Sequence, residues 1–332
     1  MRTFLIGKGI LAADESLKTI GKRLQAVGVE NTLENRRNYR NLLFSTPNLE
    51  SYISGAIMHN ETVFQSCTGD DRLFVDMLTD KNIIVGVKVD TGLQALPGTS
   101  SLETCCTGLD GLQDRATLYF QRGVRFAKWR AVLHISPSSP SPLAIQENAW
   151  ALARYAKVVQ DCGIVPVIEP EVLMEGQHTI EQAAAVQEAV LTAVYQALHY
   201  NHVFLEGSIL KPSMTCPGPQ CVQQATREQI AEYTIRTLER TVPCAVPGIA
   251  FLSGGLLEEQ ASIYLDAINK QKHRAPWTMT FSFGRGLQQS CLKVWRGRRE
   301  NEMAAQEALL ARSRANSEAS LGKYVSGSQP YV

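Results

Sequence analysis

The 332-residue sequence has no long hydrophobic run and no excess of charge of either sign. Its longest apolar stretches, such as 82–87 and 249–252, are far too short to cross a bilayer. A net charge of +1, with 20% charged residues, gives no electrostatic reason to expect nucleic acid or a membrane surface as a partner. The first residues lack a full hydrophobic segment and a cleavage site, so we expect no signal peptide.

Cysteine pairs with metal-ligand spacing and clustered histidines are missing as well. The eight cysteines include the adjacent pair Cys105-Cys106 but no C-x-x-C pair, so we expect reduced thiols in a cytoplasmic protein. His199 and His202 are the only histidines close in sequence, and no matching acidic or cysteine partner stands nearby. Because a tuned metal site needs more ligands, we expect no metal and no cofactor.

Short apolar segments alternate with amphipathic ones along the chain. The predicted strands are 6–13, 55–59, 83–89, 126–132, 165–170, 203–210, 249–253 and 279–283. The predicted helices include 143–161, 180–200, 227–240 and 258–271. Continuous apolar strands suit a parallel sheet that is buried on both faces. Repeated strand–helix alternation therefore predicts a (β/α)8 TIM barrel, with a doubly wound open sheet as the alternative.

The end of the chain differs in composition. Residues 301–314 have a helical pattern, whereas 315–332 is rich in serine, glycine and other small residues. We predict one barrel domain over residues 1–314, which includes this C-terminal helix, and a mobile tail over 315–332.

Charged or anion-binding residues follow seven of the predicted strands. They are Asp14, Lys88, Lys128 with Arg130, Glu169 with Glu171, Lys211, Ser253 with Gly254 and Gly255, and Ser282 with Gly284 and Arg285. The carboxyl ends of parallel barrel strands meet at one rim, where the active site lies. A rim salt bridge would explain any single lysine, but the whole set predicts a catalytic site.

Lysines and paired carboxylates suit Schiff-base chemistry. A neutral lysine amine attacks a ketone, and the resulting iminium stabilises the carbanion that remains when a neighbouring C–C bond breaks. The other lysines would neutralise phosphates or hold the amine partner deprotonated. Glu169 and Glu171 would point to the same side of an extended strand. Crowding would keep one of them protonated near pH 7 as a general acid, unless the motif is only a solvated acidic turn.

Two glycine loops predict anion binding. Ser253-Gly254-Gly255 lies between an apolar strand and a helix, so its backbone N–H groups can approach an anion. The run 284–286 repeats this arrangement after the next strand, and loops after strands seven and eight form the common phosphate site of such barrels. The run 7–12 fits G-x-G-x-x-A, but it leads into a strand instead of a helix, which argues against a dinucleotide site.

Six segments carry a likeness to a known family. They are G-K-G-I-L-A-A-D-E-S (7–16), F-A-K-W-R (126–130), V-I-E-P-E (167–171), L-E-G-S-I-L-K-P (205–212), F-L-S-G-G (251–255) and F-S-F-G-R (281–285). All of them resemble animal-type class I fructose-bisphosphate aldolases, and the Lys211 segment is close to diagnostic. The resemblance covers nearly the whole chain. It implies reversible cleavage of fructose 1,6-bisphosphate to dihydroxyacetone phosphate and glyceraldehyde 3-phosphate, in glycolysis and gluconeogenesis.

The resemblance also implies a role for each matching residue. Lys211 would form the Schiff base with the C2 ketone, and Glu169 would be the acid and base for carbinolamine formation and dehydration. Lys128 would help to keep the amine neutral, and Asp14 would orient the C4 hydroxyl. The supporting residues would be Glu171 and Arg130. The phosphate-binding residues would be Ser253, Gly254 and Arg285 at the C1 phosphate, and Ser16, Thr19 and Lys88 towards the C6 phosphate. Ser282 and Gly284 would be further substrate- or phosphate-binding residues.

The sequence departs from the family pattern in three places. The family has a further amino-terminal helix before the first Gly-Lys-Gly, and its absence would expose the barrel floor. Family tails are longer and end in a tyrosine that assists proton exchange, whereas Tyr331 is penultimate here, so we do not carry that role over. Thr91 and the run 94–97 differ from the family pattern, and 100–103 is one residue longer, which would alter affinity more than chemistry.

Members of the family are typically cytosolic homotetramers that need no metal. The resemblance therefore implies a homotetramer, with actin as a further partner. Three alternatives remain open: a non-catalytic scaffold, a Schiff-base lyase for another sugar phosphate, and use of fructose 1-phosphate as an additional substrate. The complete set of charged residues argues against the first, and two phosphate-binding ends argue against the second. The lack of a histidine cluster argues against a metal-dependent aldolase.

Overall fold

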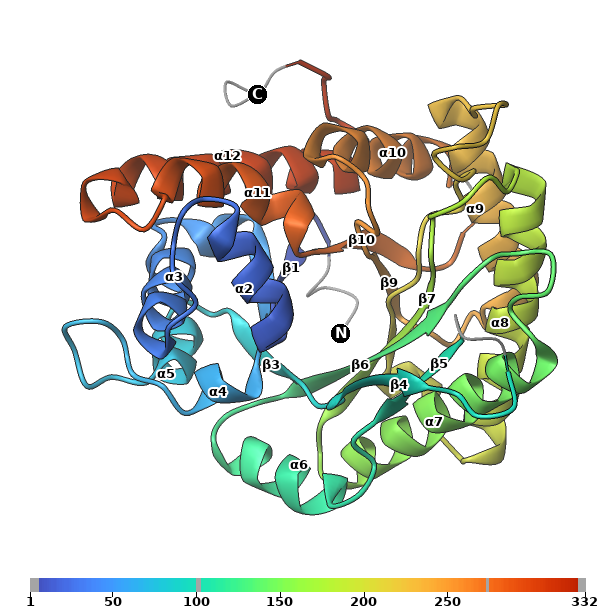
Figure 1. Cartoon of the computed structure of the whole chain (residues 1–332), viewed down its shortest axis with the longest axis horizontal. Helices are drawn as coiled ribbons and strands as arrows, with labels where there is room; N and C mark the ends of the chain where they lie inside the picture. Colours follow the sequence, from blue (N-terminus) through green and yellow to red (C-terminus); the bar gives the residue numbers. More distant parts are fainter. Residues whose placement is uncertain (1–5, 100–102, 273–274, 328–332) are drawn as a thin grey trace.

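The chain folds into a closed barrel of parallel strands surrounded by helices (Figure 1). The computed structural model describes residues 6–99, 103–272 and 275–327, so Tyr331 lies outside the described residues. Around the barrel the strands are β1 (Gly9–Ala13), β10 (Thr278–Phe283), β9 (Gly248–Phe251), β8 (Ile209–Leu210), β7 (Val165–Val172), β6 (Phe126–Leu133), β3 (Ile84–Lys88) and β2 (Ile53–Met58). β1 closes the ring by pairing with both β2 and β10. The predicted TIM barrel is confirmed, and the open sheet is excluded.

The helices lie on the outer face of the barrel (Figure 1). They are α2 (Leu17–Gln25), α3 (Leu33–Ser45), α4 (Asn60–Val63), α5 (Phe74–Asp80), α6 (Leu112–Gln121), α7 (Pro142–Asp161), α8 (Ile180–Tyr200), α9 (Arg227–Thr241), α10 (Glu258–Gln271), α11 (Arg285–Trp295) and α12 (Glu302–Ser320). Hydroxyl groups begin several of them: Thr32, Thr179 and Thr226 each accept the backbone N–H three residues on, which would otherwise lack a partner.

Strand residues alternate between the barrel interior and the surrounding helices. The interior contains a cluster that we call the apolar layer: Ile10, Ala12, Ile57, Phe126, Val167, Ile209 and Ala250. The ring of Phe126 covers Gly86 of β3, where a Cβ would lie 2.2 Å from a ring carbon. Glycine is therefore required at position 86 to make room for this ring.

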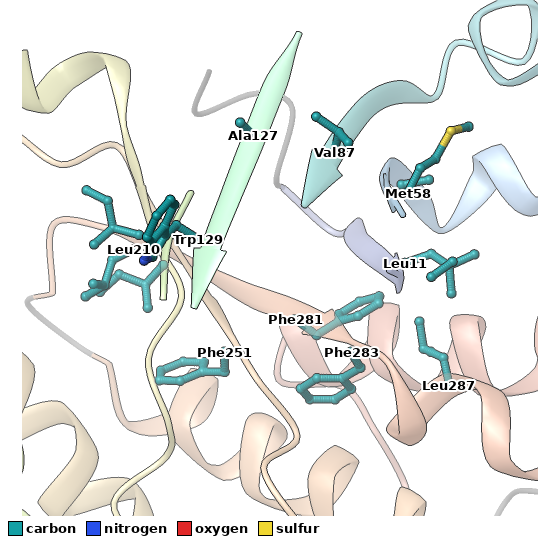
Figure 2. Close-up of a cluster of buried hydrophobic side chains, with 14 of the residues drawn as sticks. Leu11, Met58, Val87, Ala127, Trp129, Leu210, Phe251, Phe281, Phe283 and Leu287 are labelled. Atoms are coloured by element: carbon teal, nitrogen blue, oxygen red, sulfur yellow. The ribbon is translucent and has the colours of Figure 1, made fainter. Parts of the chain in front are cut away.

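The opposite faces of the same strands pack against helices. Together they form a larger hydrophobic cluster between the barrel and the helices. Figure 2 shows part of this larger cluster, with Leu11, Met58, Val87, Ala127, Trp129, Leu210, Phe251, Phe281, Phe283 and Leu287 labelled. Trp129 of β6 stacks on Tyr155 of α7 with ring centroids 5.5 Å apart. The Tyr155 hydroxyl reaches the carbonyl oxygens of Ala127, at 2.7 Å, and Val167, at 3.0 Å. These contacts hold α7 against β6, which carries Lys128 and Arg130, and β7, which carries Glu169 and Glu171.

Three elements differ from the sequence-based expectation. The strand predicted over 203–210 shrinks to β8, because Leu205–Gly207 forms a 3-10 helix. The helix predicted to end at 314 continues to Ser320, because Ala315 and Ala319 are fully buried. After α12, Tyr324 is buried and its hydroxyl binds Glu259, so the described part of the predicted tail packs on the barrel.

The third difference is an antiparallel hairpin that the sequence did not suggest. After β3 the chain leaves the barrel to form β4 (Gly92–Ala95) and β5 (Thr104–Thr107), and it returns through α6 to β6. Among the described residues, none of the helices is long and apolar enough to cross a membrane.

Candidate active site

Four buried charged residues stand at the carboxyl ends of the strands, and we call them the charged layer. They are Asp14 after β1, Lys128 on β6, Glu169 on β7 and Lys211 after β8. Each lies two residues beyond a member of the apolar layer on the same strand. Because the side-chain period of a strand is two, all four side chains point into the barrel.

Lys128 is the centre of the charged layer. Its Nζ lies 2.8 Å from Asp14 Oδ2 and 2.9 Å from Glu169 Oε2. Burial disfavours the ammonium form, but the two carboxylates outweigh burial and raise the pKa of Lys128 above its usual range. Burial likewise opposes ionisation of Asp14, but Lys128 and Lys211 lower the pKa of Asp14. Lys128 and Asp14 are therefore held as a charged pair.

Lys211 shares the carboxylate of Glu169 with Lys128. Its Nζ is 3.1 Å from Glu169 Oε1, and its backbone N–H donates to Ile168 O at 2.8 Å, which extends the pairing of β8 with β7. Burial would raise the pKa of Glu169, but Lys128 and Lys211 lower it. The resting site therefore has an ionised carboxylate between two lysine amines.

Glu171 also points into the site but has a different partner. Its carboxylate accepts a hydrogen bond from Arg130 Nε. Burial would lower the pKa of Arg130, but the negative charge of Glu171 outweighs burial and raises it. Glu169 and Glu171 thus lie on one side of β7, as predicted, but each binds its own cations. Glu169 is not the protonated acid that crowding was predicted to give, because Lys128 and Lys211 outweigh burial and the negative charge of Asp14 and lower its pKa.

The loop after β9 has a backbone that only glycine adopts readily. Gly254 and Gly255 have φ angles of +39° and +98°. A Cβ on Gly254 would lie 2.6 Å from the side chain of Leu252. Glycine therefore allows the backbone at this point to turn towards the cavity, which suits an anion held by backbone N–H groups.

The end of β10 adds an arginine, a helix terminus and a hydroxyl. Arg285 is the first residue of α11, after Gly284, so the positive end of the helix dipole lies at the cavity. Ser282 is 1% exposed, and its Oγ has no hydrogen-bond partner within the described residues. A buried hydroxyl without a partner is a group that a ligand would satisfy.

A second group of polar residues comes from the start of α2 and the end of β3. Ser16 caps α2: its Oγ accepts the Thr19 N–H at 3.3 Å and lies 3.1 Å from Thr19 Oγ1. Lys88 places its Nζ 2.5 Å from Asp90 Oδ1. Hydroxyl groups and an ammonium group are donors that suit a second anion.

All these groups surround one cavity of about 610 Å³. Every residue predicted for the site lines it: Asp14, Ser16, Thr19, Lys88, Lys128, Arg130, Glu169, Glu171, Lys211, Ser253, Gly254, Ser282, Gly284 and Arg285. The predicted residues therefore lie around one cavity, and the catalytic or binding role of each of them stays a prediction. Within the described ranges, no group of three or more His, Cys, Asp or Glu side chains could hold a metal ion. Independence from metal stays a prediction.

The cavity is also lined by residues that the sequence did not single out for the site, among them Glu15, Arg23, Asp90 and Cys106. Glu15 is buried and pairs with Arg23 and Arg40, and these arginines overcome burial to lower the pKa of Glu15. The sequence did contain a signal for Glu15 and Asp90, because both are charged and follow a buried strand closely. Nothing in the sequence marked Cys106, which the β4–β5 hairpin brings to the cavity.

Comparisons with known proteins agree with this geometry. Residues 2–331 match the family described as glycolytic fructose-bisphosphate aldolase class-I. The chain is 54% identical to cytosolic fructose-bisphosphate aldolase 4 of Arabidopsis thaliana, over 97% of this chain and 82% of the relative. It is also 54% identical to the cytoplasmic isozyme of Spinacia oleracea, over 97% and 89%.

A solved structure shows the same likeness. It contains fructose-bisphosphate aldolase from Plasmodium falciparum in complex with TRAP and a small-molecule inhibitor. The TM-score is 0.96 at 48% identity, over 98% of this chain and 94% of the other. The names of the two plant relatives confirm the cytoplasmic location predicted from the sequence.

Proposed function

The chain belongs to the class-I fructose-bisphosphate aldolase family, and we propose that Lys211 is the amine through which it works. The activity is the reversible aldol cleavage of fructose 1,6-bisphosphate. The observation that supports Lys211 is the sharing of Glu169 by two lysines. Lys128 contacts two carboxylates and stays an ammonium, which cannot attack a ketone. Lys211 contacts only one carboxylate among the described residues and is the better nucleophile.

Bond formation begins at the C2 ketone. The neutral Nζ of Lys211 attacks C2, and the carbonyl oxygen takes up a proton from solvent to give a carbinolamine. Glu169 accepts a proton from the nitrogen and returns one to the C2 hydroxyl, which leaves as water. When Lys211 is neutral, one of the three cations that lower the pKa of Glu169 is gone, so its carboxylate is a stronger base at this step.

Bond cleavage follows from the iminium. Its positive charge accepts the electron pair of the C3–C4 bond as that bond breaks, and the C4 hydroxyl loses its proton to give the aldehyde of glyceraldehyde 3-phosphate. The enamine left on Lys211 is protonated at C3 and hydrolysed to release dihydroxyacetone phosphate. Asp14, whose pKa is lowered, is ionised before this step, accepts a hydrogen bond from the C4 hydroxyl and takes up its proton as the bond breaks.

The phosphates fix the substrate at both ends. We assign the C1 phosphate to the β9 and β10 loops, through Ser253, Gly254, Ser282, Gly284 and Arg285. We assign the C6 phosphate to Ser16, Thr19 and Lys88. Glu171 and Arg130 hold each other at the edge of the cavity and support the C1 side. Binding at both ends favours a bisphosphate over a monophosphate.

Borohydride trapping tests the nucleophile. Reduction of the protein in the presence of fructose 1,6-bisphosphate should leave one substrate-derived adduct on the peptide that contains Lys211, and none in Lys211→Met. Cleavage by the untreated protein should persist with EDTA present. An adduct on Lys128 or Lys88, or undiminished cleavage by Lys211→Met, would refute the assignment. Activity that EDTA abolishes would refute metal independence.

Assembly is a separate proposal that rests on the family resemblance. We infer a homotetramer, with actin binding as an additional property. Trp150 on α7 and Tyr200 at the end of α8 are 46% and 60% exposed, which is apolar surface of the kind that subunit contacts cover. Sedimentation velocity should give one species of tetramer mass, and co-sedimentation with actin filaments should deplete the protein from the supernatant. A monomeric species, or no depletion, would refute the respective proposal.

A further inference from the structure

Asp90 is a buried acid in the cavity wall that the proposed reaction does not use. It lies two residues after Lys88, where the chain leaves the barrel towards the β4–β5 hairpin. Its side chain is 3% exposed. Its two oxygens have different partners: Oδ1 is 2.5 Å from Lys88 Nζ, and Oδ2 accepts the backbone N–H of Arg130 at 3.3 Å.

The contact with Arg130 fixes this carboxylate to the barrel. β3 ends at Lys88, which is paired with Lys128 of β6. β6 continues to Leu133, so Arg130 has no β3 residue opposite it. The N–H of Arg130 would lack a partner at this edge, and Asp90 satisfies it. The thiol of Cys106 donates to the carbonyl of the same residue at 2.6 Å. The segment between β3 and β6 thus binds both backbone groups of Arg130, and Asp90 is held as a consequence.

Held in this way, Asp90 orients the amine of Lys88. Nζ contacts Asp90 Oδ1 and also donates to the backbone carbonyl of Asp90 at 2.8 Å. An ammonium group has three donors, so one remains for a ligand in the cavity. The charge of Lys88 also reaches Asp14 and helps to lower its pKa. Without Asp90, the ammonium would be drawn towards the carboxylates of the charged layer.

We propose that Asp90 is a positioning residue that acts through Lys88 to set the affinity for the C6 phosphate, and with it the preference for a bisphosphate over a 1-phosphate. The proposal rests on the assignment of Lys88 to the C6 phosphate in the proposed function. An oriented lysine loses less side-chain freedom when the phosphate binds, because Asp90 has already restricted it. This gain outweighs the attraction that the negative charge of Asp90 removes.

The ratio of kcat/KM for fructose 1,6-bisphosphate to kcat/KM for fructose 1-phosphate tests the proposal. Asp90→Asn should lower this ratio about tenfold, since one charge-assisted contact to phosphate is weakened. The change should appear as a higher KM for the bisphosphate with little change in its kcat. Lys88→Met should lower the ratio at least as much, and the double variant should match Lys88→Met alone. Asp90→Ser, which removes the charge with a smaller side chain, should behave like Asp90→Asn.

The inhibition constants of mannitol 1,6-bisphosphate and mannitol 1-phosphate measure the same preference without turnover of either ligand. Equal losses with both ligands in Asp90→Asn and Asp90→Ser would mean a merely structural role and overturn the inference. An unchanged or higher ratio would also overturn it, and so would additive effects in the double variant. If Lys88→Met changes the ratio but Asp90→Asn does not, only the inference fails. If Lys88→Met leaves the ratio unchanged, the assignment of Lys88 fails with it.

Discussion

The apolar layer and the charged layer occupy the same barrel. On each strand that contributes to both, the charged residue lies two positions after an apolar one. Phe126 precedes Lys128, Val167 precedes Glu169, and Ile209 precedes Lys211. Both layers are buried, yet burial has opposite energetic consequences in them. Each large apolar side chain contributes about 1.5–3 kcal/mol when it leaves water. Each ion costs several kcal/mol to desolvate, and only its partners offset that penalty.

The two layers therefore depend on their members in different ways. An apolar side chain contributes its own burial and packing, so its loss is felt mainly as stability. A charged side chain is needed by its partners: Lys128 neutralises two carboxylates, and Glu169 serves two lysines. The loss of one member changes the protonation and position of the others, so we expect it to affect the chemistry first.

Replacement of Lys128 by methionine should give the largest effect. The change leaves Asp14 without its contact and leaves Glu169 with Lys211 alone. We expect kcat for fructose 1,6-bisphosphate to fall by about 10²–10⁴, because the acid–base group and the C4-hydroxyl acceptor both change protonation. Stability at pH 7 should fall by about 3–5 kcal/mol, since buried carboxylates lose a partner. Steady-state kinetics and denaturant unfolding measure the two quantities.

Lys157→Met is the matched control. Lys157 pairs with Asp161 on the exposed face of α7, and its side chain is 41% exposed. The same substitution there should change stability by less than about 1 kcal/mol and leave kcat within about twofold. Equal effects of the two variants would show that the charged layer has no special dependence on Lys128.

The sequence predicted the position of the charged layer because its residues follow apolar strands directly. It also predicted α8 and α10 to the residue, since their amphipathic patterns and start signals agree. It failed where tertiary contacts decide. Ala315 and Ala319 resemble a tail in composition, yet they are small enough to pack closely against the barrel as part of α12. No local signal distinguishes those two roles.

The electrostatics were harder to predict than the positions. Glu169 and Glu171 are two residues apart, so crowding between them could be expected from the sequence, whereas the lysines that lower the pKa of Glu169 come from other strands. Asp90 was missed for a related reason. Its importance depends on the end of β3 opposite Arg130, and strand ends are set by the hairpin that follows.

Replacement of Phe126 by alanine should give an effect of intermediate size, on stability alone. The ring fills the space above Gly86, so its removal leaves a cavity that the backbone cannot close. We expect a loss of about 3–5 kcal/mol in the free energy of unfolding. The kcat of the folded fraction should stay within about tenfold of the wild type, because the charged layer keeps all its members.

Phe120→Ala is the control for that experiment. Phe120 lies on α6 and is 40% exposed, so the same truncation should cost about 1 kcal/mol or less. Unfolding is followed by denaturant titration, and activity is measured below the transition. A fall in kcat as large as that of Lys128→Met would show that the two layers are not separable.

The pH dependence of stability should give the smallest effect, but it should distinguish the charged layer from the apolar layer most sharply. In the wild type the folded-state pKa values of Asp14 and Glu169 are lowered, so their ion pairs stabilise the fold fully above the ordinary carboxyl pKa near 4. This contribution decreases as the pH falls below that value and is lost once the pH passes the folded-state pKa. In Lys128→Met, the ammonium that opposes burial most strongly is gone, so burial raises the pKa values of Asp14 and Glu169. The folded state then binds protons more readily than the unfolded state.

The destabilisation caused by Lys128→Met should therefore shrink as the pH is lowered from 7 to about 4, by on the order of 2 kcal/mol for each carboxylate. Urea unfolding at a series of pH values measures this difference directly. Exposed carboxylates far from the charged layer titrate alike in both proteins and cancel in the comparison. Phe126→Ala should show a penalty that does not depend on pH, because no ionisable group is changed. A pH-independent penalty for Lys128→Met as well would mean that the charged layer is stabilised by packing, as the apolar layer is, and not by its ion pairs.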